Sequence, residues 1–112
     1  MTRLDLLRTR LDTERKMMTL ATIAHVPTPH GSRYLQQLCK HWSHKLDVEF
    51  DAGQGTIRFP SGAVVTLEAG AADLGARIEA PDGETLERMK TVLAEHLDRF
   101  AFREAPLPFA WS

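Results

Sequence analysis

Residues 48–80 read VEFDAGQGTIRFPSGAVVTLEAGAADLGARIEA, and this run carries the strongest structural pattern of the chain. Apolar and polar side chains alternate along four short parts of it, at residues 48–51, 57–59, 65–69 and 74–80. The segments between these parts contain glycine and are typical of turns. An apolar residue at every second position is typical of a strand with one buried and one solvated face. The run therefore predicts an antiparallel meander of four strands.

Helical patterns flank the meander on both sides. Residues 30–46 place their apolar side chains within one arc at about 100° per residue. These side chains are Tyr34, Leu35, Leu38, Cys39, Trp42 and Leu46. Residues 82–100 carry a second apolar stripe, and Asp82 is placed to cap the N-terminus of that helix. An apolar run at residues 20–26, closed by Pro27, predicts one more strand ahead of the first helix.

The predicted order of elements is therefore β-α-β-β-β-β-α. Both apolar stripes are buried if the two helices lie on one face of a mainly antiparallel sheet, so we expect an α+β fold built as a two-layer sandwich. After the second helix, residues 102–111 hold two prolines and alternate Leu107, Phe109 and Trp111. This pattern predicts a short C-terminal edge strand or an extended arm packed on the sheet.

The domain organisation follows from the same patterns. Residues 18–112 are expected to form a single α+β domain, and residues 1–17 an N-terminal helical extension in which leucines recur at helical spacing. Met17 and Met18 lie just before the first strand pattern. The extension is therefore interpreted either as a segment upstream of the natural start of translation or as a helix that docks on the domain or on a partner.

The composition excludes several classes of protein. The 112 residues carry a formal net charge of -1, which argues against a globally basic nucleic-acid-binding protein. We also expect no nucleic-acid partner because the sequence predicts no exposed aromatic side chain in a basic context. Cys39 is the single cysteine, which excludes an intramolecular disulfide. No apolar run suits a membrane span or a signal peptide, so we expect a cytoplasmic protein without a membrane partner.

The helix predicted at residues 30–46 concentrates positive charge. Its sequence contains no acidic residue, and the side opposite its apolar arc is basic. That side and its margins hold His30, Arg33, Gln37, Lys40, His41, His44 and Lys45. Arg99 and Arg103, near the end of the second helix, would extend this surface if the two helices lie side by side.

Two interpretations of this basic face remain open. It is either a solvated face or a binding surface for an anionic ligand or partner. Cations near a helix C-terminus complement the helix dipole, which accounts for Lys40 and Lys45 but not for Arg33 near the N-terminus. An arginine presents a planar fork that matches a carboxylate or a phosphate. Histidines would add positive charge in mildly acidic solution.

A metal site is a further alternative. His41 and His44 lie three residues apart, share one side of the helix and could both reach one ion. Two ligands are too few for a structural or catalytic site, and His30 lies about 16 Å away from His41 along the helix axis. A histidine from another part of the sequence could act as a third ligand only if the fold brings it close to His41 and His44.

The sequence contains no catalytic motif, so we predict no catalytic residues and name no cofactor. A protein that is not an enzyme is favoured. The alternatives are a metal-binding protein or metal-dependent enzyme that uses His41 and His44, and a structural module that forms a homodimer.

Two segments resemble the signatures of an uncharacterised bacterial family, domain of unknown function 2218. They are TPHGSRYLQQLCKHWSHK at residues 28–45 and HLDRFAFRE at residues 96–104, and the similarity extends over about residues 18–111. Related domains are associated with siderophore-interacting flavoproteins and iron-acquisition genes. The resemblance therefore implies a binding or accessory role in iron or siderophore handling, with a ferric siderophore or a siderophore-interacting flavoprotein as partner. It implies no activity and assigns no catalytic residue.

Overall fold

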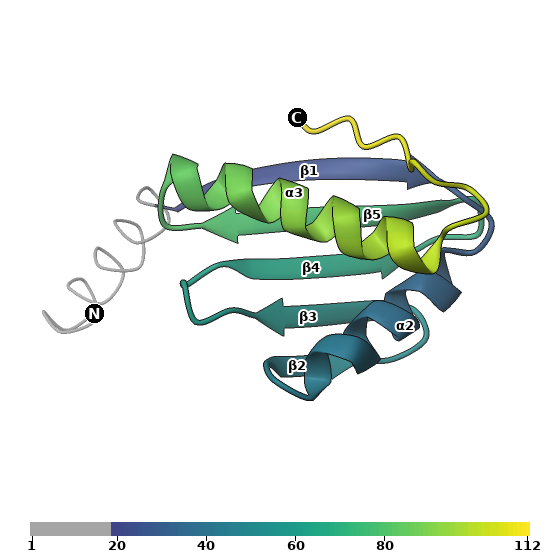
Figure 1. The fold of residues 1–112 in the computed structure, drawn as a ribbon, viewed down its shortest axis with the longest axis horizontal. Coiled ribbons are helices and arrows are strands. Elements are labelled where there is room, and N and C mark those ends of the chain that lie inside the picture. Colours follow the sequence, from purple (N-terminus) through teal and green to yellow (C-terminus); the bar gives the residue numbers. More distant parts are fainter. Residues whose placement is uncertain (1–18) are drawn as a thin grey trace, which may run out of the picture.

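The computed structural model describes residues 19–112, and these form two helices and five strands in the predicted order (Figure 1). The elements are β1 (Leu20–Pro27), α2 (Gly31–Ser43), β2 (Asp47–Phe50), β3 (Gln54–Arg58), β4 (Val64–Ala69), β5 (Asp73–Ala80) and α3 (Gly83–Phe100). The four-stranded meander and both flanking helices are therefore confirmed. The helical extension expected over residues 1–17 lies outside the described residues.

The sheet is antiparallel throughout, with the strand order β1-β5-β4-β3-β2. β1 pairs with the last strand of the meander along its whole length, from Leu20 opposite Ala80 to Pro27 opposite Asp73. The two strands that flank α2 in the sequence, β1 and β2, thus form opposite edges of the sheet. α2 contacts β5, β4, β3 and β2, and it thereby spans the sheet between these edges.

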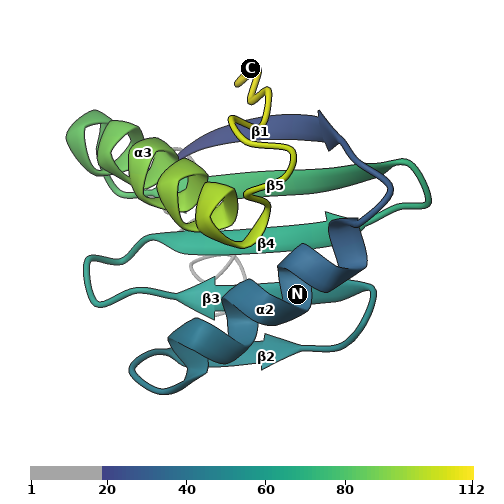
Figure 2. The same cartoon turned by 45° about the vertical axis from the view of Figure 1, so that its right-hand side comes forward.

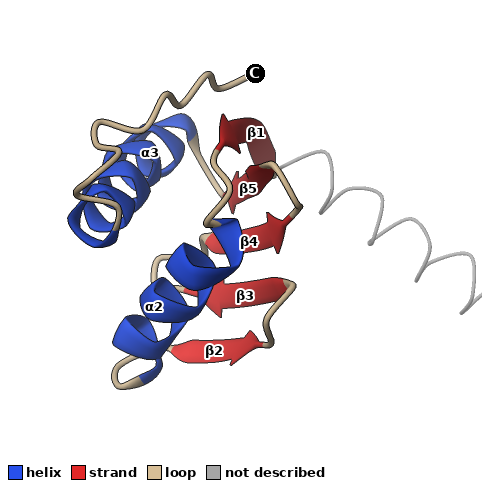
Figure 3. Cartoon of the chain, turned by 90° about the vertical axis from the view of Figure 1, so that its right-hand side faces the viewer, coloured by secondary structure: helices blue, strands red, loops and turns tan. Residues whose placement is uncertain are grey.

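Both helices cover the same face of the sheet, which makes the two-layer α+β sandwich (Figure 3). α2 packs against β2 to β5, whereas α3 packs against β5 and β1, and the two helices contact each other. The predicted apolar arcs meet the alternate apolar positions of the strands in one core. Fully buried side chains from the helices and the sheet are Leu35, Leu38, Leu93, Leu97, Ile57, Leu67 and Ile78.

Gly55 in β3 permits the close approach of α2 to the sheet. A Cβ atom at this position would lie 2.7 Å from Sγ of Cys39 and 3.2 Å from Cβ of Phe50. Cys39 is accordingly buried, as its place in the apolar arc predicts. Burial raises the pKa of its thiol to about 11.

The two helices begin differently. Asp82 caps α3 as predicted, because its carboxylate accepts a hydrogen bond of 2.7 Å from the backbone N–H of Thr85. α2 follows His30, whose side chain makes no capping hydrogen bond, and the first turn of α2 holds no acidic residue.

Within residues 19–112, neither helix combines the length and the apolar composition of a membrane-spanning segment.

Of the two forms predicted for the C-terminal tail, the structure shows the extended arm and not the edge strand. Residues 101–104 form a turn, and residues 105–112 contain no strand and run as an extended arm beside β1 (Figure 2). The contact with this edge is local: Ser112 and Ile23 exchange two backbone hydrogen bonds of 3.0 and 3.4 Å, and Thr22 Oγ1 donates to Ser112 O at 2.9 Å. Pro106 and Pro108 have no N–H to donate, which explains why a regular ladder does not form.

Candidate anion-binding site

A cavity of about 410 Å³ opens between the start of α2 and the turn that follows α3. Its lining residues are His30, Arg33, Tyr34, Gln37, Phe100, Phe102, Arg103 and Glu104. All eight come from the two segments that resemble the family signatures, residues 28–45 and 96–104. The fold therefore brings these distant segments of the sequence together at one site.

Glu104 links the two sides of the cavity, the start of α2 and the turn after α3, through hydrogen bonds. Its carboxylate accepts hydrogen bonds from the hydroxyl of Tyr34 and, at 3.0 Å, from Oγ1 of Thr28. Oγ1 of Thr28 in turn accepts the backbone N–H of His30 at 3.1 Å. Tyr34 and Thr28 are both buried, whereas Glu104 is half-buried. The turn at residues 101–104 is thus held against the N-terminus of α2.

Hydrogen bonding and burial shift the pKa values of Glu104 and Tyr34 in opposite directions. The hydrogen bond from Tyr34 lowers the pKa of Glu104, and the hydroxyl of Thr28 and the imidazole of His30 lower it further. Burial raises the pKa of Tyr34, and the neighbouring Glu104 carboxylate raises it further. At neutral pH, Glu104 is therefore an anion and Tyr34 a neutral donor.

Arg33 and Arg103 supply positive charge to the cavity from two different elements. Arg33 is in the first turn of α2 and Arg103 is in the turn after α3, and both are exposed. Neither forms an ion pair with any residue of the described part of the chain. Glu104 lines the same cavity, but its carboxylate is bonded to two hydroxyls. The guanidinium groups therefore keep their N–H donors available to a ligand.

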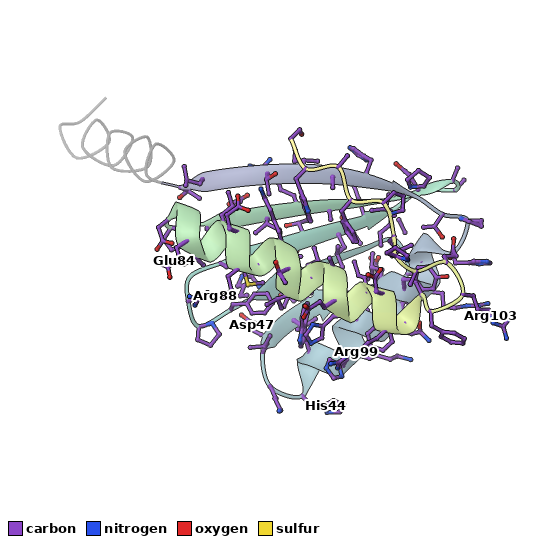
Figure 4. All side chains as sticks on the ribbon, turned by 45° about the horizontal axis from the view of Figure 1, so that its top comes forward. His44, Asp47, Glu84, Arg88, Arg99 and Arg103 are labelled. Atoms are coloured by element: carbon purple, nitrogen blue, oxygen red, sulfur yellow. The ribbon has the colours of Figure 1, made fainter. Side chains whose placement is uncertain are left out.

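The remaining basic residues of the predicted surface do not line this cavity. Lys40, His44 and Lys45 are exposed on the later part of α2 and beyond its end, and Arg99 is exposed in the last turn of α3. Figure 4 labels His44 and Arg99 near the ends of the two helices and Arg103 in the turn that follows α3. Within residues 19–112, none of the three side chains Lys40, Lys45 and Arg99 makes an ion pair. Of the predicted residues, His30, Arg33, Gln37 and Arg103 meet at the cavity.

His41, one of the two residues of the predicted metal site, lies against α3. Its ring centroid is 5.7 Å from that of His96 and 6.0 Å from that of Phe100. Nδ1 of His96 is hydrogen-bonded to the backbone carbonyl of Val92 at 2.7 Å, which favours the tautomer protonated at that nitrogen. Among residues 19–112, no three histidine, cysteine or acidic side chains are grouped so that they could hold a metal ion. The pair His41 and His44 therefore gains no third ligand from the described part of the chain.

Four residues of the cavity are absent from the predicted site, namely Tyr34, Phe100, Phe102 and Glu104. Phe102 is 70% exposed, and the guanidinium carbon of Arg103 lies 5.8 Å from its ring centroid. The prediction that no exposed aromatic lies in a basic context is therefore wrong at this position. For Phe102 and Glu104 the sequence offered one signal, which is their place in the segment 96–104 that resembles the second family signature.

A second cavity, of about 540 Å³, is lined by the turns between β2 and β3 and between β4 and β5, together with neighbouring strand residues. It is acidic, because Asp51, Glu68 and Asp73 are among its lining residues. Asp51 accepts the backbone N–H groups of its own turn, and Asp73 lies 3.2 Å from Nδ1 of His25. Its charge makes it unsuitable for an anion, although it is larger than the cavity between α2 and the turn after α3.

Comparisons with known proteins agree with the fold. A family model described as "Uncharacterized protein conserved in bacteria (DUF2218)" matches residues 23–112. The solved structure described as the NMR structure of PA4090 from Pseudomonas aeruginosa is 35% identical to the chain and has a TM-score of 0.70. The similarity covers 82% of this chain and 94% of that one. No curated protein matches the chain.

Proposed function

Since the chain belongs to the bacterial family DUF2218, whose description names no activity, we propose from the geometry that it is a non-enzymatic binding domain for a small anion. The cavity between α2 and the turn after α3 is the proposed site. One observation carries the proposal: Arg33 and Arg103 line the same cavity, and neither has a carboxylate partner within residues 19–112. Two guanidinium forks from different elements are suited to bind carboxylate or phosphate oxygens.

The position of Arg33 argues against the alternative of a merely solvated helix face. The positive end of the helix dipole is at the N-terminus, where a cation is disfavoured. Arg33 is in this first turn, which contains no acidic side chain to compensate it. Helix electrostatics therefore accounts for Lys40 near the C-terminus of α2 but not for Arg33.

The charge balance of the cavity also favours an anion. Arg33 and Arg103 face a single carboxylate, that of Glu104, and this carboxylate already accepts hydrogen bonds from Tyr34 and Thr28. The cavity therefore has a positive excess, whereas the whole chain carries a formal net charge of -1. Its volume of about 410 Å³ falls in the range of small-molecule sites, so a small anion suits it better than the flat face of a protein.

The iron context of the proposal comes from the resemblance of the two signature segments. Ferric siderophore complexes are often anionic, and they form one class of ligand that such a cavity would attract. We include a cytoplasmic location in the proposal, which suits the single, buried and unpaired Cys39.

The proposal is tested by a matched pair of double variants. Arg33→Gln with Arg103→Gln removes two positive charges from the cavity, and Lys40→Gln with Lys45→Gln removes two from the exposed surface of the same basic region. We expect calorimetric titration with citrate to show about tenfold or greater weakening in the arginine variant and little change in the lysine variant. Equal weakening in both variants, or no binding to the unmodified chain, would contradict the proposal.

A second titration tests the iron context separately. Citrate and its ferric complex are compared on the unmodified chain in the same buffer. Tighter binding of the ferric complex is the result expected of a protein that handles chelated iron. Equal or weaker binding of the ferric complex would oppose the iron context and would leave the anion site itself standing.

A further inference from the structure

Phe102 is held in an exposed position at the cavity. It is the most exposed of the large hydrophobic side chains that the structure describes, at 70%. Its exposure does not arise from a loose tail, because Ala101 on one side is buried and Glu104 on the other is bonded to Tyr34 and Thr28. A phenyl ring is a large apolar surface, and its fixed exposure in a lined cavity is typical of a binding site.

Arg103 adds a second planar group beside this ring. Its guanidinium carbon lies 5.8 Å from the ring centroid of Phe102, which is within the range of a cation–π contact. The contact orients the guanidinium, while its N–H groups have no ion-pair partner among residues 19–112. An aromatic surface and an anion-binding fork are thus adjacent in sequence and in space.

Further rings line the cavity. Tyr34 and Phe100 contribute aromatic side chains, and the imidazole of His30 lies edge-on to the ring of Tyr34 with 6.1 Å between centroids. Half of the eight lining residues therefore carry a planar ring. Aromatic groups prefer to meet other rings in offset-stacked or edge-to-face arrangements, which such a lining offers to a planar ligand.

We infer that the preferred ligand of the cavity is a planar aromatic carboxylate, whose ring stacks on Phe102 while its carboxylate binds Arg33 and Arg103. This inference rests on the proposed function and narrows it from small anions in general to one chemical class. Glu104 does not prevent such binding, because its carboxylate is occupied by the hydroxyls of Tyr34 and Thr28.

Two probes of equal charge and similar size test the inference. Benzene-1,3-dicarboxylate is planar and aromatic, and cis-cyclohexane-1,3-dicarboxylate is its saturated counterpart. We expect the aromatic probe to bind the unmodified chain roughly threefold to tenfold more tightly in a titration followed by NMR. In the Phe102→Leu variant we expect this preference to fall to about one, because the aromatic probe loses the ring on which it stacks.

The outcomes separate the inference from the proposed function. Equal affinities for the two probes, or a preference that persists in Phe102→Leu, would overturn the aromatic inference. Binding of citrate without binding of either dicarboxylate would overturn it too, while the anion site would stand. If citrate and both dicarboxylates fail to bind, the proposed function and the aromatic inference are both wrong. A melting curve of Phe102→Leu serves as the control for folding, since the side chain is exposed.

Discussion

The hydroxyl of Tyr34 in α2 donates a hydrogen bond to the carboxylate of Glu104, which lies 70 positions later in the sequence, in the turn after α3. Through this contact a buried side chain of the helix holds the segment that carries Phe102 and Arg103. The cavity is therefore shaped before a ligand arrives, and binding does not have to order its two walls.

We expect Tyr34→Phe to lower the melting temperature by about 4–8 °C, the shift produced by the loss of one hydrogen bond in a domain of this size. The variant keeps the buried ring and removes only the donor, while Thr28 continues to bond Glu104. Calorimetric melting of Tyr34→Phe, Glu104→Gln and the double variant measures the coupling. Strictly additive shifts would show that the two side chains do not stabilise each other.

Glu104 makes stability depend on pH with a definite sign. Because the pKa of Glu104 is lowered in the folded chain, its contribution is complete above the ordinary glutamate pKa of about 4.3 and is lost as the pH falls through the lower folded value. We therefore expect Glu104→Gln to flatten the rise in melting temperature with pH in acid solution, up to the ordinary glutamate pKa of about 4.3.

Two other carboxyl groups leave a residual slope in that experiment. Backbone N–H groups lower the pKa of Asp51 and of Asp82, so the unmodified chain and Glu104→Gln both keep some dependence on pH. The comparison is therefore the difference between the melting curves of the unmodified chain and of Glu104→Gln at each pH. Parallel curves for the two chains would show that Glu104 has an ordinary pKa in the folded protein.

The close packing of α2 on the sheet predicts a contrast between two glycines. Gly55→Ala would place a Cβ atom 2.7 Å from Sγ of Cys39, and overpacking of this kind costs about 1–3 kcal/mol of unfolding free energy. Gly53→Ala would meet its nearest atom, Oδ1 of Asp51, at 3.6 Å and is expected to change stability by less than about 0.5 kcal/mol. Urea denaturation measures both. A stable Gly55→Ala would mean that α2 can move away from the sheet.

The secondary structure could be predicted from the sequence because the apolar pattern of each element depends on which of its sides is buried. The period-two alternation of the strands and the apolar arc from Tyr34 to Trp42 both arise from which side of an element is buried. Asp82 identified the start of α3 by the same kind of local signal. The tail was less predictable, because the alternation of Leu107 and Phe109 resembles a strand but the intervening prolines prevent a ladder.

The cavity could be predicted only in part, because its geometry depends on contacts between distant segments. Arg33 stood out through the lack of acidic neighbours, which is a property of the local sequence. The role of Glu104 depends on how the chain turns after α3 and meets Tyr34, and no periodicity encodes that meeting. The surroundings of His41 were not predictable either, because its ring lies beside that of His96 on the other helix.

The most direct test of the anion site is a map of where an anion binds. Titration of the ¹⁵N-labelled chain with citrate, followed by two-dimensional NMR, reports each backbone amide separately. We expect the largest shifts at residues 30–37 and 100–104, on the two walls of the cavity. Shifts that centre on residues 40–45, or that are spread evenly over the basic surface, would contradict the assignment of the site to the cavity between Arg33 and Arg103.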